Sequence, residues 1–126
     1  MPTSFDYAAI RVVPRVERQE FINAGVVVFC LEKRYLAARI HLDEQRLRAL
    51  WPAIDVELVR EHLEAIPRVC AGDPAAGPIA MLSQRERFHW LISPRSTIIQ
   101  PSPVHSGLCE SPAELPGRLA KQMLDV

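Results

Sequence analysis

Alternation of hydrophobic and polar positions dominates the first third of the chain and predicts three β-strands. In the first of them, Ala8, Ile10 and Val12 form a wholly apolar face, whereas the opposite face carries Arg11 among hydrophobic residues. The second is almost continuously apolar, which is typical of a strand that is covered on both faces. The strands are predicted at residues 5–14, 21–31 and 34–42.

A period of three to four residues replaces the alternation after the third strand and predicts helices. Asp43, Asp55 and Ser83 stand at N-cap positions, and Ser83 forms a capping box with Glu86. Pro67 should kink or shorten the second helix, because proline removes a backbone donor and clashes with the preceding turn. The helices are predicted at residues 43–51, 56–71 and 83–93, with a last helix starting at Ser111 or Pro116.

The order of these elements predicts an α+β fold. The β-branched stretch at residues 97–100 favours a short fourth strand, and the proline-rich residues 101–107 favour an irregular loop. We therefore expect a small, mostly antiparallel sheet of three N-terminal strands plus one short late strand, packed with four to five helices. The length fits a single domain over residues 1–126.

Composition and charge narrow the class of protein. Fifteen basic residues balance fifteen acidic ones, so nucleic acid is an unlikely partner on electrostatic grounds. The three cysteines form no disulfide framework, which favours reduced thiols and a cytoplasmic location. Residues 24–31 form the longest apolar run, which is too short to span a bilayer, and the first residues do not have the pattern of a signal peptide.

Arginines and hydroxyl side chains are the main candidates for a binding site. Guanidinium groups beside hydroxyls and exposed backbone N–H groups suit a phosphate or a carboxylate. The same arginines could instead form internal ion pairs with Asp6, Glu20 or Glu86. The candidate anion-binding residues of this type are Arg11, Arg18, Arg87, Arg95, Ser96 and Thr97.

Other single residues allow both a functional and a structural interpretation. Asn23 precedes Gly25 by two positions, which favours a β-bulge but also fits a backbone that a ligand approaches. His105 is a weak candidate for an acid or base, and otherwise a hydrogen-bonded loop histidine. Cys109 is a still weaker nucleophile candidate. Trp90 could be half-exposed, where it would stack on a ligand or pack against a partner, or it could instead pack against the last helix.

No sequence pattern indicates a metal or a cofactor. The four histidines are scattered, and no Cys/His cluster has ligand spacing. Glycine-rich phosphate-binding motifs are missing as well. We therefore predict neither a metal site nor a bound cofactor.

Four blocks of residues, spread over nearly the whole chain, resemble a bacterial family catalogued as domain of unknown function 3037. The blocks are Phe5-x-Tyr7-x-x-Ile10-Arg11-x-x-Pro14, Arg18-x-Glu20-x-x-Asn23-x-Gly25-Val26-Val27, Glu86-Arg87-Phe88-x-Trp90-Leu91-x-x-Pro94-Arg95-Ser96-Thr97 and Gln100-x-Ser102-Pro103-Val104-His105-x-Gly107. Pro67 departs from the uninterrupted helix expected in such proteins. The resemblance implies a protein partner, a kinase-like neighbour of the toxin–antitoxin type.

Two classes of function remain open. The first is a cytosolic binding or accessory protein whose arginine-rich surface holds a small anionic ligand or an acidic surface of a partner. The alternative is a small hydrolase or transferase for a phosphorylated or carboxylated substrate, with His105 as acid or base. The alternative predicts one concave pocket that contains His105 and at least two arginines.

Overall fold

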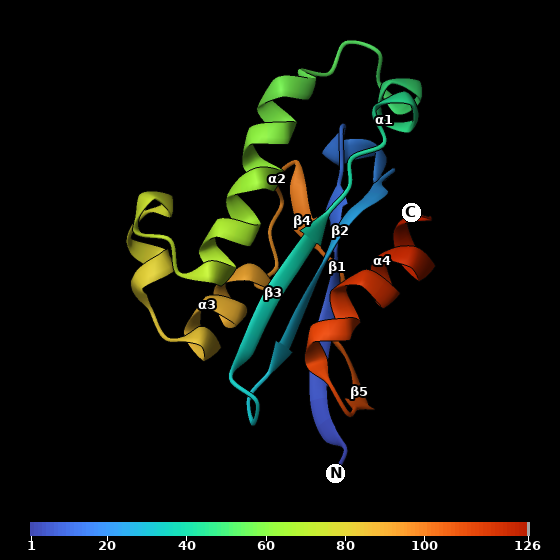
Figure 1. The fold of residues 1–126 in the computed structure, drawn as a ribbon. Helices are drawn as coiled ribbons and strands as arrows, with labels where there is room; N and C mark the ends of the chain where they lie inside the picture. Colours follow the sequence, from blue (N-terminus) through green and yellow to red (C-terminus); the bar gives the residue numbers. More distant parts are fainter. Residues whose placement is uncertain (126) are drawn as a thin grey trace.

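The computed structural model describes residues 1–125 and places an antiparallel sheet between helices (Figure 1). Within these residues the sheet has five strands in the order β3-β2-β1-β4, and β5 also pairs with β1. The class is α+β, as predicted. The strands are β1 (Thr3–Val12), β2 (Ile22–Cys30), β3 (Tyr35–Ile40), β4 (Ile99–Pro101) and β5 (His105–Cys109).

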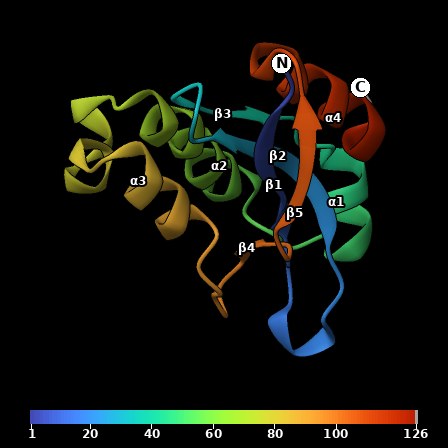
Figure 2. The same ribbon diagram turned by 90° about the horizontal axis from the view of Figure 1, so that it is seen from below.

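Helices cover both faces of this sheet. Helices α2 and α3 pack on one face, and α4 packs on the other (Figures 1 and 2). The core is therefore divided into two clusters by the sheet, with Ala8, Ile10 and Val12 on the α2 face and Phe5 on the α4 face. The α-helices are α1 (Glu44–Leu50), α2 (Val56–Ala71), α3 (Gln84–Leu91) and α4 (Leu115–Leu124).

The predicted starts of α1, α2 and α3 are confirmed by their caps, whereas Ser111 makes no capping hydrogen bond before α4. The side chains of Asp43 and Asp55 accept hydrogen bonds from backbone N–H groups in the first turns of α1 and α2. Ser83 and Glu86 form both bonds of the capping box at the start of α3. A 3₁₀ turn at Pro112–Glu114 leads into α4. The three capped starts depend only on residues that are neighbours in the chain, which explains why the sequence predicts them.

Helix α2 has the predicted bounds and runs through Pro67 to Ala71, so Pro67 does not shorten it. The buried stripe of Val59, Leu63 and Ile66 packs against the sheet and outweighs the backbone hydrogen bond that proline removes. Gly72 ends the helix, because its positive φ of 73° lets the N–H of the following Asp73 donate back to the Arg68 carbonyl at 3.0 Å.

The predicted loop at residues 101–107 is too long, because β5 begins at His105 and includes its last three residues. The fourth strand lies at Ile99–Pro101, two residues later than its predicted start. Strand β1 is long enough to pair with β4 through its second half and with β5 through its first half. Pairing with a distant strand thus gives regular structure to residues that lack a local strand pattern.

Candidate ligand-binding groove

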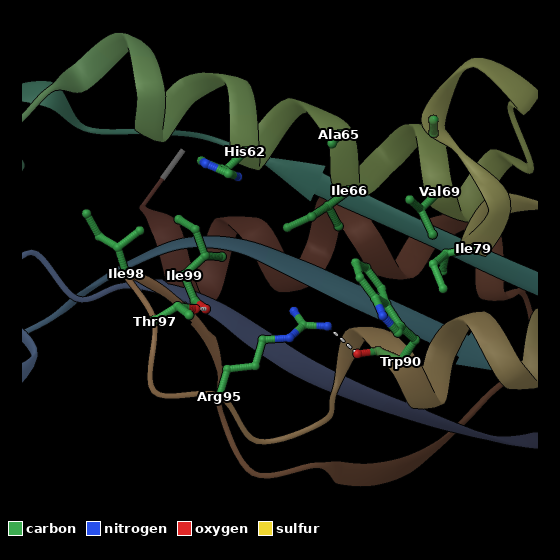
Figure 3. A pocket seen from close by; sticks show the side chains of 11 residues that line it. His62, Ala65, Ile66, Val69, Ile79, Trp90, Arg95, Thr97, Ile98 and Ile99 are labelled. Carbon is green, nitrogen blue, oxygen red and sulfur yellow. Dashed lines mark hydrogen bonds between the residues drawn. The ribbon is translucent and has the colours of Figure 1, made fainter.

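A groove of about 350 Å³ lies on the α2 face of the sheet, between α2 and the segment that leads into β4 (Figure 3). Its lining is mainly aliphatic, with the indole of Trp90 as its aromatic part and Arg95 as its fixed charge. The volume is in the range of small-molecule sites. The lining residues are His62, Ala65, Ile66, Val69, Ala76, Ile79, Trp90, Arg95, Thr97, Ile98 and Ile99.

Helix α2 supplies one wall of the groove through the edge of its buried stripe. His62 lies one turn before Ile66, and Val69 follows Ile66 by a further turn, so the three side chains line the same side of the helix. Figure 3 shows them in this order along α2, facing Ile98, Ile99 and Arg95. The groove is therefore an unfilled continuation of the core at the edge of the sheet.

Arg95 is held at the groove by the end of α3. Its Nη2 donates a hydrogen bond to the carbonyl oxygen of Trp90, and its Cζ lies 4.4 Å from the centroid of the Trp90 ring. Both contacts are favourable, because a cation stabilises the carboxyl end of a helix and an aromatic face attracts a guanidinium. Burial lowers the pKa of Arg95 from its ordinary value.

No carboxylate among the described residues forms an ion pair with Arg95. A partly buried cation without a counter-charge favours an anion at this position. The neighbouring Thr97 also lines the groove, but its hydroxyl donates to the carbonyl of Ile99 at 3.0 Å. Ser96 is exposed and does not line the groove.

Arg87 has a structural position instead. Its Nη1 donates to the carbonyl oxygens of Val69 and Cys70 at 3.0 and 2.7 Å, and its Nε donates to that of Leu82 at 2.9 Å. The two bonds from Nη1 go to carbonyls in the last turn of α2, of which that of Val69 also accepts the N–H of Gly72. The guanidinium of Arg87 is thereby directed away from the groove that contains Arg95.

Arg11 lies on the other face of the sheet from Arg95. It shares a face with Phe5 and Tyr7 by strand alternation, whereas Arg95 lies beside Ile10. The Cζ of Arg11 stands 4.2 Å from the centroid of the Phe21 ring, and its buried Nε lacks a hydrogen-bond partner among the described residues. The structure therefore does not bring Arg11 and Arg95 together at one site.

The remaining candidates are also outside the groove. Arg18 is exposed and forms an ion pair with Glu20 at 2.5 Å. Asn23 is exposed and pairs with Arg11, while Gly25 pairs with Ile10, so Ala24 is the extra residue of a β-bulge. His105 is exposed on β5, where its ring lies 5.5 Å from that of Tyr7. The groove therefore does not unite His105 with two arginines.

Sequence reasoning missed His62 and the aliphatic wall from Ile98 and Ile99. The available signal was the position of His62 one turn before Ile66, on the margin of the apolar stripe of α2. Trp90 met the expectation of partial exposure, with 40% of its surface accessible, and its aromatic face is stacked with Arg95. His62 meets Ile98 and Ile99 across the groove only in the folded protein, so their proximity leaves no local pattern in the sequence.

Residues 1–125 contain neither a cluster of metal-ligand side chains nor a membrane-spanning helix. No group of His, Cys, Asp and Glu side chains in this range could hold a metal ion. No helix there combines the length and apolarity needed to cross a bilayer. A second cavity, of about 260 Å³, lies between β1 and α3, and its polar lining includes Asp6, Glu32, Arg85 and His89.

The fold and the groove define a small α+β protein with one cationic, largely aliphatic cleft at a sheet edge. A family model described as protein of unknown function (DUF3037) matches residues 7–124. The chain belongs to this family. Comparisons with curated proteins and with solved structures gave no match.

Proposed function

We propose that this chain is a binding or accessory protein whose groove holds the apolar part of an anionic ligand. The observation that carries the proposal is Arg95, a partly buried guanidinium with an aromatic and a carbonyl partner but no carboxylate partner. An anion would supply the missing charge, and the aliphatic walls would remove the rest of the ligand from water. His105 is not used, which weighs against the acid–base alternative.

The same site would also suit an acidic surface of a protein partner. Met81 and Leu82, which directly precede α3, are exposed apolar residues, and Trp90 near the end of α3 is a third. Trp90 is the one of these three that contacts Arg95, and an exposed aromatic side chain beside a cation is typical of protein contacts. The kinase-like neighbour implied by the family resemblance is the partner that we propose for such a contact. Loss of co-purification with that neighbour in an Arg95→Ala variant would support it.

The groove is tested with 8-anilinonaphthalene-1-sulfonate, which combines an anionic group with an aromatic body. Because Trp90 lines the groove, its fluorescence in a Trp51→Phe background reports binding there. Arg95→Ala should weaken binding at least about fivefold, which corresponds to one charge-assisted contact of ~1 kcal/mol. Ala65→Phe should abolish binding by filling the groove.

Arg118→Ala is the matched control, because Arg118 is exposed on α4 at the other face of the sheet. Its affinity for the dye should equal that of the parent. Equal affinities in the Arg95→Ala, Ala65→Phe and Arg118→Ala variants would show that the dye binds elsewhere and would contradict the proposal. Circular dichroism of each variant verifies that the fold is retained.

A further inference from the structure

The cationic end of the groove is suited to a single negative charge. Arg95 is the one permanently charged residue among those that line it, and one of its five N–H donors is already engaged by the Trp90 carbonyl. The free donors on the edge of the guanidinium fit the two oxygens of a carboxylate. A second negative charge would find no second cation here.

The backbone around Arg95 disfavours a phosphate. Phosphate sites use the amino end of a helix or a concave row of backbone N–H groups. Arg95 lies instead at the carboxyl end of α3, where carbonyl oxygens carry partial negative charge. The hydroxyl of Thr97 donates to Ile99 and is not free for an anion. A dianion therefore gains less at this position than a carboxylate.

The apolar part of the groove sets the size and nature of the ligand body. Its volume of about 350 Å³ corresponds to roughly a dozen non-hydrogen atoms, if each takes about the 30 Å³ of a water molecule. Ile66, Ile79 and Ile99 line it, and Figure 3 shows the indole of Trp90 beside Arg95. A flat aromatic or compact branched body fits between an indole and aliphatic walls.

The edge of β4 is unsuitable for an added peptide strand. The Ile99 carbonyl accepts the Thr97 hydroxyl, and the Thr97 carbonyl accepts the Gln100 side-chain amide at 2.7 Å. Pro101 has no N–H to donate. A peptide in the groove would therefore lack the main-chain ladder by which extended peptides bind to sheet edges. The occupant favoured by these contacts is a free small molecule.

We infer that the groove binds a small monocarboxylic acid with an apolar, preferably aromatic, body of about a dozen non-hydrogen atoms. This inference rests on the proposed function and specifies its ligand class. The carboxylate meets the edge of Arg95, and the body lies between Trp90 and the aliphatic side chains of α2 and β4.

The test compares probes that share one body and differ in the head group. Isothermal titration calorimetry near neutral pH uses 1-naphthylacetate, 1-naphthyl phosphate, 1-naphthylmethanol and acetate. The acid should bind about tenfold more tightly than the phosphate or the alcohol, and acetate should not bind measurably. Arg95→Ala should remove the difference between acid and alcohol, whereas Arg118→Ala should preserve it.

The outcomes separate this inference from the proposed function. Tighter binding of the phosphate, or binding of the sulfonate dye without binding of the naphthyl acid, would overturn the monocarboxylate class and leave the anion-binding groove intact. Equal binding of the acid and the alcohol would also overturn it. If neither the dye nor the naphthyl acid binds, both proposals fail.

Discussion

Arg87 closes the carboxyl end of α2 with two hydrogen bonds to its backbone carbonyls and makes a third to the carbonyl of Leu82. Arg95, in the same segment of the chain, makes one such bond and stacks on Trp90. The two side chains are chemically identical, so their roles are set by what surrounds them. For Arg87 all the partners are fixed parts of the fold, and its contribution is to stability. For Arg95 the unmatched charge leaves capacity for a ligand.

Replacing Arg87 with Ala should therefore destabilise the protein. The carbonyls of Val69 and Cys70 would lose a charged donor in a partly buried setting, which predicts a loss of about 2–3 kcal/mol in the free energy of unfolding. Urea denaturation measures this loss. Arg85→Ala in the same helix is the control and should change stability by less than about 0.5 kcal/mol, because Arg85 is exposed. Equal losses in the two variants would contradict the structural role of Arg87.

At the scale of elements, β5 depends on β1 more than on its own residues. Its glycine, Gly107, pairs with Phe5 of β1, and the Phe5 ring covers the space where a side chain would stand. Ser106 donates a hydrogen bond of 2.6 Å to Asp6 across the same pair of strands. A glycine flanked by serine and histidine is a weak strand signal, so the strand forms because a partner with the right register lies beside it.

Gly107→Ala tests this packing. A Cβ at this position would lie 2.9 Å from Cζ of Phe5, and because the ring is buried, relief requires movement of the core. We expect a loss of about 1–3 kcal/mol in the free energy of unfolding. Thermal unfolding followed by circular dichroism measures it, with Leu108→Thr as a control at an exposed neighbouring position. A Gly107→Ala variant as stable as the parent would show that Phe5 moves aside freely.

At the scale of the whole molecule, two hydrophobic clusters on opposite faces of one sheet enclose all three cysteines. Cys70 lies in the α2 cluster, where burial raises the pKa of its thiol from 9.0 to about 12. The folded protein therefore keeps this thiol protonated at a pH where the unfolded chain releases the proton. The stability that the thiol contributes is complete below about pH 9 and is lost as the pH rises toward 12.

The free energy of unfolding should accordingly fall above pH 9 more steeply in the parent protein than in Cys70→Ala. Each pH unit between the two pKa values weakens the parent by up to about 1.4 kcal/mol, so the difference between the proteins should change by about 2 kcal/mol by pH ~10.5. Urea denaturation under reducing conditions at several pH values measures this change. Parallel pH curves for the two proteins would contradict the burial of the thiol. Burial raises the pKa of Tyr35 in both proteins and this part cancels, whereas the smaller rise that comes from Cys70 is lost in Cys70→Ala.

The amino-acid sequence alone was sufficient for most elements and for the class of fold. Caps at Asp43, Asp55 and Ser83, the alternation in β1 and the apolar run in β2 depend on residues that are close together in the chain. The α2 stripe likewise followed from periodicity. The contacts that produce these patterns lie within one or two turns of the chain. The patterns are therefore recognisable without knowledge of distant partners.

The tertiary structure decided which polar residues meet. It separates Arg11 from Arg95 across the sheet, gives Arg87 to the end of α2, and places His105 outside the groove. It also brings His62 of α2 opposite Ile98 and Ile99, residues distant in sequence. Such outcomes depend on strand pairing and on how helices pack across the sheet, which are set by contacts between remote segments. Local patterns in the chain identify the elements and their buried faces, whereas the groove and the arginine that faces it arise only when the fold is packed.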